Sequence, residues 1–92
     1  MFIKGLVSIV TPAYNCDKYI SQTIDSVINQ TYPKWEMVII NDNSTDNTLS
    51  VIKKYAEIDQ RIKIVSLNMN LGAANARNLG LSNALGQYIA FL

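Results

Sequence analysis

The chain contains four short apolar segments, and each has the length and composition of a buried strand. They are Leu6–Thr11, Trp35–Asn41, Arg61–Leu67 and Gln87–Leu92. Valine and isoleucine are frequent in the first three, and none of the four alternates strictly between apolar and polar residues. Pro12 is expected to end the first strand. The pattern predicts a sheet whose strands are covered on both faces.

Apolar residues between the first two strands recur with helical spacing. In Lys18–Gln30 they fall at positions i, i+4, i+7 and i+8, which is one face of a helix. Asn15 or Asp17 is expected to cap the start of this helix. Pro33 disfavours helical geometry at the residue before it, so the helix should end there.

Two further helices continue the alternation. The apolar positions of the second are Leu49, Ile52, Tyr55 and Ala56. The third is the Ala- and Leu-rich segment Ala73–Leu85, whose small residues allow a close approach to the sheet, and Gly86 is expected just after its end. The order β-α-β-α-β-α-β predicts a three-layer α/β/α fold, with a mainly parallel sheet and right-handed crossovers.

Composition is that of an ordinary globular domain. The 92 residues are 49% apolar and 16% charged, with a net charge of +1. Neutrality without basic clusters argues against nucleic acid as a partner. No apolar run approaches the roughly 18 residues of a membrane span. The single cysteine, Cys16, is consistent with a reducing compartment, so we expect a cytoplasmic protein, free or peripheral at the inner face of the membrane.

Signatures of several common sites are missing from the sequence. No G-x-G-x-x-G follows the first strand, and there is no P-loop motif. Without histidine and with one cysteine, the chain cannot build a Ser-His nucleophilic site, and a zinc site is not expected. Cys16 stands beside a helix start, where a thiol pKa can be lowered, but a lone cysteine is more often a packing residue.

Polar side chains concentrate after the predicted strands, where an open parallel sheet binds its ligands. The segments are Thr11–Asn15, Asn41–Asp46 and Asn68–Gly72. Tyr14 either stacks on a planar base or packs over a helix end, and its spacing does not separate the two. Asp42 is the candidate acceptor for a nucleobase N–H, whereas Ser44 and Asp46 are expected to form the turn and cap the next helix.

Arg77 is the only charged side chain after Lys63. A guanidinium on an otherwise neutral helix requires an anionic partner. That partner is either the diphosphate of a ligand or an internal acid such as Asp42, and the residues leave both open.

Several segments resemble, in order, the motifs of family 2 glycosyltransferases. They are Val7–Asn15, Ser26–Tyr32, Val38–Asp46, Asn70–Gly80 and Gly86–Leu92. The second resembles the family's S-x-x-x-Q-T-Y helix end, the third its V-V-D-D-G-S-T-D segment and the fourth its N-x-G-x-x-x-A-R-N-x-G helix. The last resembles the strand that leads into the metal-binding D-x-D motif. Asn41 and Asn43 depart from the family, which usually has Asp and Gly there.

The resemblance implies a GT-A fold, of which this chain would be the Rossmann-like half, and a nucleotide-diphosphate-sugar donor, most often with uracil as the base. By position, Tyr14 would pack against the base, and Asp42 would accept from its N3–H. Arg77 would stand near the diphosphate or brace Asp42. The pocket wall would be shaped by backbone contacts of Thr11, Pro12 and Ala13.

The resemblance further implies that residues 1–92 are the nucleotide-sugar-binding portion of a longer domain. The uncapped apolar segment at Leu92 also favours a chain that continues, the alternative being a short protein with a buried last strand. The D-x-D motif, which holds Mg²⁺ or Mn²⁺, would follow Leu92, and the catalytic Asp and the acceptor-binding half would lie beyond it. No catalytic or metal-binding residue is therefore expected within this chain.

We thus expect a parent enzyme that transfers a sugar from a UDP-sugar or related donor to a hydroxyl of a saccharide or lipid-linked acceptor, with inversion. The chain alone should bind a donor weakly and should not catalyse. One alternative is a non-catalytic α/β nucleotide-binding or signalling module. Another is a sugar nucleotidyltransferase, but the Gly-rich basic loop of those enzymes has no counterpart in Pro12–Asp17.

Overall fold

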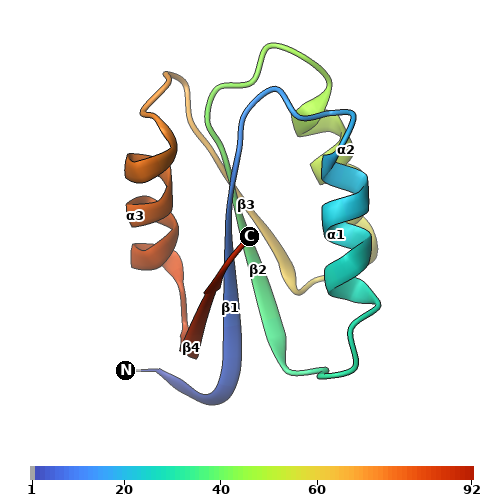
Figure 1. Ribbon diagram of the computed structural model, residues 1–92, viewed down its shortest axis with the longest axis vertical. Helices are drawn as coiled ribbons and strands as arrows, with labels where there is room; N and C mark the ends of the chain where they lie inside the picture. The colour runs from blue at the N-terminus through green and yellow to red at the C-terminus, as the bar shows by residue number, and fades with distance from the viewer. Residues whose placement is uncertain (1) are drawn as a thin grey trace.

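The computed structural model describes residues 2–92 and contains the predicted alternation of strands and helices. The elements are β1 (Ile3–Ala13), α1 (Ile20–Ile28), β2 (Trp35–Asn41), α2 (Thr48–Ile58), β3 (Ile62–Ser66), α3 (Ala73–Asn83) and β4 (Gly86–Phe91). All strand pairs are parallel, in the order β3-β2-β1-β4. Helices α1 and α2 cover one face of the sheet and α3 the other (Figure 1). The three-layer, Rossmann-like α/β fold is confirmed.

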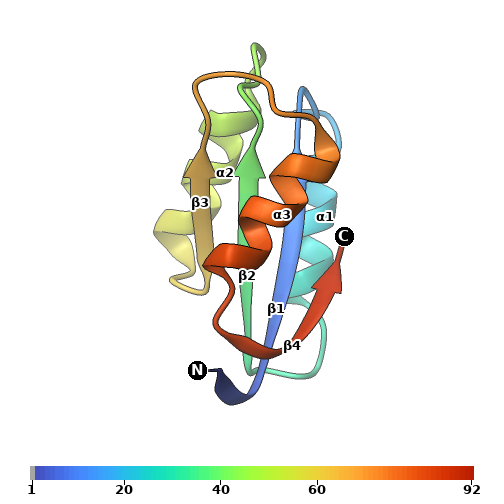
Figure 2. The same cartoon turned by 90° about the vertical axis from the view of Figure 1, so that its left-hand side faces the viewer.

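The core lies on both faces of β2, whose seven residues are all buried. On one face, Ile24 of α1 and Ile52 of α2 are fully buried against the sheet. On the other face, α3 packs across β1 and β2, as Figure 2 shows. In β4 only Gly86 is buried and the other five residues are exposed. The prediction of burial is confirmed for β2, whereas β4 is exposed at the edge of the sheet that residues 2–92 form.

Strand β1 continues through Pro12 to Ala13, so the prediction that Pro12 ends it is wrong. The Ala13 carbonyl accepts a hydrogen bond from Asp42 on the β2 side, whereas the Val10 carbonyl accepts one from Leu92 on the β4 side. Because partners alternate along a parallel strand, the nitrogen of Pro12 faces the β4 side. The proline therefore removes no hydrogen bond between β1 and β2.

Helix α1 begins at Ile20 without a side-chain cap, so the capping roles predicted for Asn15 and Asp17 are wrong. Asn15 Oδ1 instead accepts the N–H of Thr45 at 2.8 Å, and Asp17 Oδ2 accepts that of Asn47 at 3.3 Å. The parallel sheet places the loop after β1 beside the loop after β2. The two side chains join these loops.

Helix α3 lies close to the sheet because its buried face consists of Ala76 and Gly80. A Cβ atom on Gly80 would lie 2.4 Å from Cγ1 of Val10 and 3.4 Å from Cγ1 of Ile40. The predicted reason for the small residues of this segment is confirmed. The helix ends at Asn83, before the predicted end.

Replacing Gly80 by alanine should lower the free energy of unfolding by about 1–3 kcal/mol, because the added methyl overpacks against the buried Val10. Alanine normally favours a helix over glycine by about 1 kcal/mol, so a loss of stability would identify the steric term. Urea unfolding measures the change. Ser82→Ala on the exposed side of α3 is the control, and an unchanged or raised stability of Gly80→Ala would contradict the packing argument.

The prediction that Gly86 directly follows the end of α3 is wrong, because Gly86 is the first residue of β4. Its φ is not positive, in contrast to Gly5 and Gly72. A Cβ atom on Gly86 would lie 2.5 Å from Oγ of Ser8 and 2.7 Å from the Leu6 carbonyl oxygen. Glycine is needed here because β1 passes too close for any side chain.

Among residues 2–92, no helix has the length and apolar character of a membrane span.

Candidate functional site

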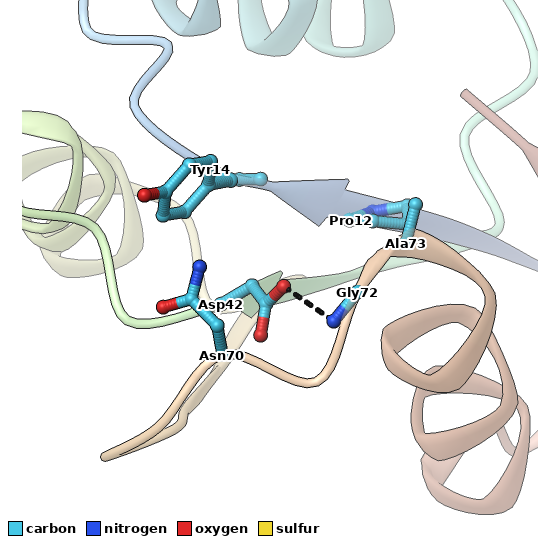
Figure 3. A pocket seen from close by; sticks show the side chains of 7 residues that line it. Pro12, Tyr14, Asp42, Asn70, Gly72 and Ala73 are labelled. Atoms are coloured by element: carbon cyan, nitrogen blue, oxygen red, sulfur yellow. Dashed lines mark hydrogen bonds between the residues drawn. The ribbon is translucent and has the colours of Figure 1, made fainter.

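A cavity of about 260 Å³ opens at the carboxyl edge of the sheet, beyond the ends of β1 and β2 (Figure 3). It is lined by Pro12, Ala13, Tyr14, Asp42, Asn70, Gly72 and Ala73. All three loops that follow β1, β2 and β3 contribute to it. The cavity therefore lies where the polar strand ends predicted a ligand, and four of the predicted site residues meet there.

Asp42 is held rigidly in the wall of this cavity. Its side chain is buried, with Oδ1 accepting the N–H of Leu71 at 2.7 Å and Oδ2 accepting that of Gly72 at 3.0 Å (Figure 3). Both donors lie at the start of α3, so the carboxylate also faces the positive end of the helix dipole. A carboxylate oxygen can accept about two hydrogen bonds. Each oxygen of Asp42 thus keeps the capacity to accept one more.

Tyr14 and Asn70 line the same cavity as the Asp42 carboxylate (Figure 3). The Tyr14 side chain is 49% exposed and lines the cavity, so its ring is accessible to a ligand. Asn70 is exposed and presents an amide with both a donor and an acceptor. Asn70, Gly72 and Ala73 were not among the predicted site residues. The polar loop after β3 was the available signal, but only the folded chain brings it back to Asp42.

Thr11, a predicted wall residue, does not line this cavity. It lies at a second hollow of about 280 Å³ between β1 and the start of α1, together with Cys16. Its hydroxyl is buried and has no hydrogen-bond partner within residues 2–92. Burial raises the pKa of the Cys16 thiol, which agrees with a packing role rather than with an activated thiol.

Arg77 also lies outside the cavity lining. It is exposed on α3, one turn after Ala73, and its guanidinium carbon is 5.7 Å from the centre of the Phe91 ring. The ion pairs within residues 2–92 are Arg61–Asp59 and Lys63–Glu36. Of the two partners left open for Arg77, an internal acid is therefore not the one observed within residues 2–92, and its charge is available to an external anion.

Ser44 and Asp46 have structural roles, but neither is the N-cap of α2 that was predicted, because the N-cap is Asn47, which makes no side-chain cap hydrogen bond. Ser44 Oγ accepts the N–H of Asn15 at 3.1 Å, which ties the first two loops together. Asp46 Oδ1 accepts the N–H of Thr48 at 2.9 Å and its hydroxyl at 2.6 Å, at the first residue of α2. Neither side chain lines the cavity.

The two departures from the family pattern leave the cavity intact. Asn43 has φ of 58°, a left-handed conformation that asparagine tolerates nearly as well as the usual glycine. Asn41 is buried between β2 and β3, where Nδ2 donates to Ser66 Oγ at 3.1 Å and Oδ1 accepts from the N–H of Ser44 at 3.3 Å. An amide suits this position because it both donates and accepts.

Residues 2–92 contain no group of three or more His, Cys, Asp or Glu side chains that could hold a metal ion. The residues described thus do not supply the ligand set of a divalent cation.

Comparison with known proteins identifies the relatives of the chain. It is 51% identical over 89 residues to TuaG of Bacillus subtilis, named as a candidate teichuronic acid biosynthesis glycosyltransferase. It is 45% identical over 87 residues to the Escherichia coli beta-1,3-glucosyltransferase WfgD, which uses UDP-Glc and alpha-D-GlcNAc-diphosphoundecaprenol by its name. The matches cover 97% and 95% of this chain. The chain spans about a third of the length of these relatives, 35% and 34% respectively.

Solved structures share the fold. Residues 1–349 of Staphylococcus aureus TarS, in complex with UDP-GlcNAc, match with a TM-score of 0.87 and 34% identity over 94% of this chain and 25% of that one. The mannosyltransferase PcManGT of Pyrobaculum calidifontis, in complex with GDP-Man and Mn²⁺, matches with a TM-score of 0.84 and 31% identity over 90% and 25%. The model of glycosyl transferase family 2 matches residues 8–92, and the chain belongs to that family.

Proposed function

We propose that the cavity at the carboxyl edge binds the nucleotide of a sugar-nucleotide donor. The observation that carries the proposal is Asp42, whose carboxylate is fixed by two backbone N–H groups yet keeps an accepting lone pair on each oxygen. An exposed aromatic ring, Tyr14, and an exposed amide, Asn70, line the same cavity. This set suits a planar base that carries a ring N–H beside a carbonyl.

Uracil is the base that we propose. Its N3–H would donate to Asp42, a carbonyl oxygen would accept from the Asn70 amide, and its ring would stack on Tyr14. Guanine is the competing base, because its two adjacent donors, N1–H and N2–H, would use the remaining lone pair on each oxygen of Asp42, whereas uracil needs only one of them. The structure of TarS with UDP-GlcNAc supports the choice of uracil. The structure of PcManGT with GDP-Man makes guanine the alternative base.

The chain would act as the donor-binding portion of an enzyme that transfers the sugar to a hydroxyl of a saccharide or lipid-linked acceptor, with inversion. The greater length of the relatives supports this division of labour. Mg²⁺ or Mn²⁺ would be required, as the Mn²⁺ complex of PcManGT suggests. A cytoplasmic location at the inner face of the membrane would suit a lipid-linked acceptor such as the one in the name of WfgD. Family membership favours this proposal over a non-catalytic module.

Isothermal titration of the protein with UDP and with GDP, each with and without Mn²⁺, tests the proposal. UDP should bind more tightly than GDP, and Mn²⁺ should strengthen binding. Tyr14→Ala should weaken UDP binding about tenfold, since base stacking on an aromatic ring contributes about 1–3 kcal/mol.

Tyr32→Ala is the matched control, because Tyr32 is equally exposed but lies before β2, at the other end of the sheet. Failure of UDP to bind in the presence of Mn²⁺ would refute the proposed site. Sub-micromolar binding of UDP without any cation would refute the role given to the metal ion.

A further inference from the structure

A buried carboxylate joins all four strands at the end of the sheet opposite the cavity. Glu36, near the start of β2, is 3% exposed. Its Oε2 accepts the hydroxyl of Ser8 in β1 and the N–H of Leu85 at 2.6 Å, and its Oε1 accepts from Lys63 Nζ of β3 at 2.7 Å. Oγ of Ser8 in turn accepts the N–H of Gly86 at 2.8 Å. We call the pair Ser8 and Glu36 the Ser8–Glu36 clamp.

The clamp satisfies backbone groups that the sheet itself leaves without partners. Pairing between β1 and β4 shifts its register between Ile3 and Val7, where Gly5 has φ of 77°. The N–H groups of Leu85 and Gly86 fall at this irregularity and donate to side chains instead of to a strand carbonyl. A buried N–H without an acceptor destabilises a fold, so the two side chains complete the start of β4.

Burial alone cannot determine where β4 pairs along β1. Within residues 2–92 all residues of β4 after Gly86 are exposed, so burial among these residues specifies the register only weakly. A slip by two residues would return every side chain to the same face. The start of β4 distinguishes the observed register. Gly86 packs against Ser8 with no room for a Cβ atom, so no other residue of β4 could occupy this position after a slip.

The register has a consequence at the opposite end of β4 (Figure 2). Pairing of Val10 with Phe91 places the Phe91 ring 5.7 Å from the guanidinium of Arg77. Arg77 lies one turn after Ala73, which lines the cavity. A slip by two residues would displace Phe91 by about 6.6 Å and remove this contact.

We propose that the Ser8–Glu36 clamp sets the register of β4 and thereby places Phe91 against Arg77, one turn along α3 from Ala73 of the cavity lining. Ser8 and Glu36 are positioning residues in this scheme, since neither reaches the cavity. The effect on nucleotide binding rests on the proposed function. The register itself is independent of what the cavity binds.

Cross-linking measures the register directly. In a Cys16→Ser background, cysteines replace Ile9 and Ala90, which pair in the structure, or Ile9 and Tyr88, which would pair after a slip by two residues. With the clamp intact, the first pair should cross-link strongly in preference to the second. Ser8→Ala should reduce this preference at least about tenfold, because it removes two hydrogen bonds, the one that the hydroxyl donates to the charged Glu36 and the one that it accepts from the N–H of Gly86.

Ser50→Ala, an exposed serine on α2, is the matched control and should leave the preference unchanged. Hydrogen exchange supplies a second measurement: Ser8→Ala should accelerate exchange in β4 but not in β3, whereas a general loss of stability would affect both. A folded Ser8→Ala protein with unchanged cross-linking and β4 exchange would overturn the proposal.

The functional arm compares UDP affinity in Ser8→Ala and in the unchanged protein. A severalfold weaker affinity in Ser8→Ala is expected, because Arg77 loses the ring that orients it. If the unchanged protein does not bind UDP, the proposed function fails, while the cross-linking result still decides the register. Equal UDP affinity in both proteins, with the register shifted, would overturn the link from the clamp to the cavity.

Discussion

Replacing Asp42 by asparagine should lower the free energy of unfolding by about 1.5–3 kcal/mol and weaken UDP binding at least about tenfold. The carboxylate accepts the N–H of Leu71 and that of Gly72, and an asparagine can accept only through one atom. Its NH₂ group would face the other backbone donor. One charge-assisted hydrogen bond is lost, the start of α3 is loosened, and the acceptor for the base N–H loses its charge.

Urea unfolding and UDP titration in the presence of Mn²⁺ measure the two effects. Glu57→Gln is the matched control, since it also removes one carboxylate charge but from an exposed position on α2. It should change the stability by less than about 0.5 kcal/mol and leave UDP binding unaltered. Equal behaviour of the two variants would show that Asp42 is neither an anchor for the loop before α3 nor a ligand for the base.

Acidification should destabilise the fold through Glu36. Burial by itself raises the pKa of Glu36, but hydrogen bonds from Lys63, Ser8 and the N–H of Leu85 outweigh it and hold the pKa below its usual value of 4.5. A carboxyl whose pKa is lower in the folded state stabilises the protein above its unfolded-state pKa. This contribution is present above about pH 4.5 and is lost as the pH falls through the lower, folded-state value.

Comparison with Glu36→Gln isolates this effect from those of other carboxyl groups. At pH 7 the variant should be less stable by about 2 kcal/mol, because neutral hydrogen bonds replace those to a charged group. Lys63, the cation that faces Glu36, remains in both proteins. The difference in unfolding free energy should shrink as the pH is lowered from 5 to 2. A difference that is constant over this range would contradict the role given to the ionised carboxylate.

Much of the fold was predictable because the signals that determine it are local. The helical spacing of Ile20, Ile24 and Val27 identified α1, and the uninterrupted apolar run of Trp35–Asn41 identified the central strand. Alternation of strands and helices then admits few arrangements besides a parallel sheet with helices on both faces. The predictions failed at element ends, at Pro12, Asn15 and Gly86, where a partner distant in sequence decides what a residue does.

The residues of the candidate site were likewise predictable only where the signal is local. Tyr14 and Asp42 were predicted because they follow strands, and the carboxyl edge of a parallel sheet gathers such residues. Pro12 and Ala13 were predicted from the resemblance to the family, and they line the cavity as the last residues of β1. Asn70 was not predicted as a site residue, because its loop is held at the cavity by the hydrogen bonds of Leu71 and Gly72 to Asp42. The Thr11 side chain faces the α1 side of the sheet and does not line the cavity, and its backbone contacts with a donor stay a prediction.

The sequence by itself determined the order of elements, the parallel sheet, the family and the edge of the sheet where a donor would bind. These follow from periodicity and from short motifs, which neighbouring residues encode. Only the tertiary structure decided that Glu36 is buried, that Arg77 lies over Phe91 rather than beside an acid, and where β4 pairs. Each of those depends on contacts between residues far apart in the chain, and no local pattern specifies them.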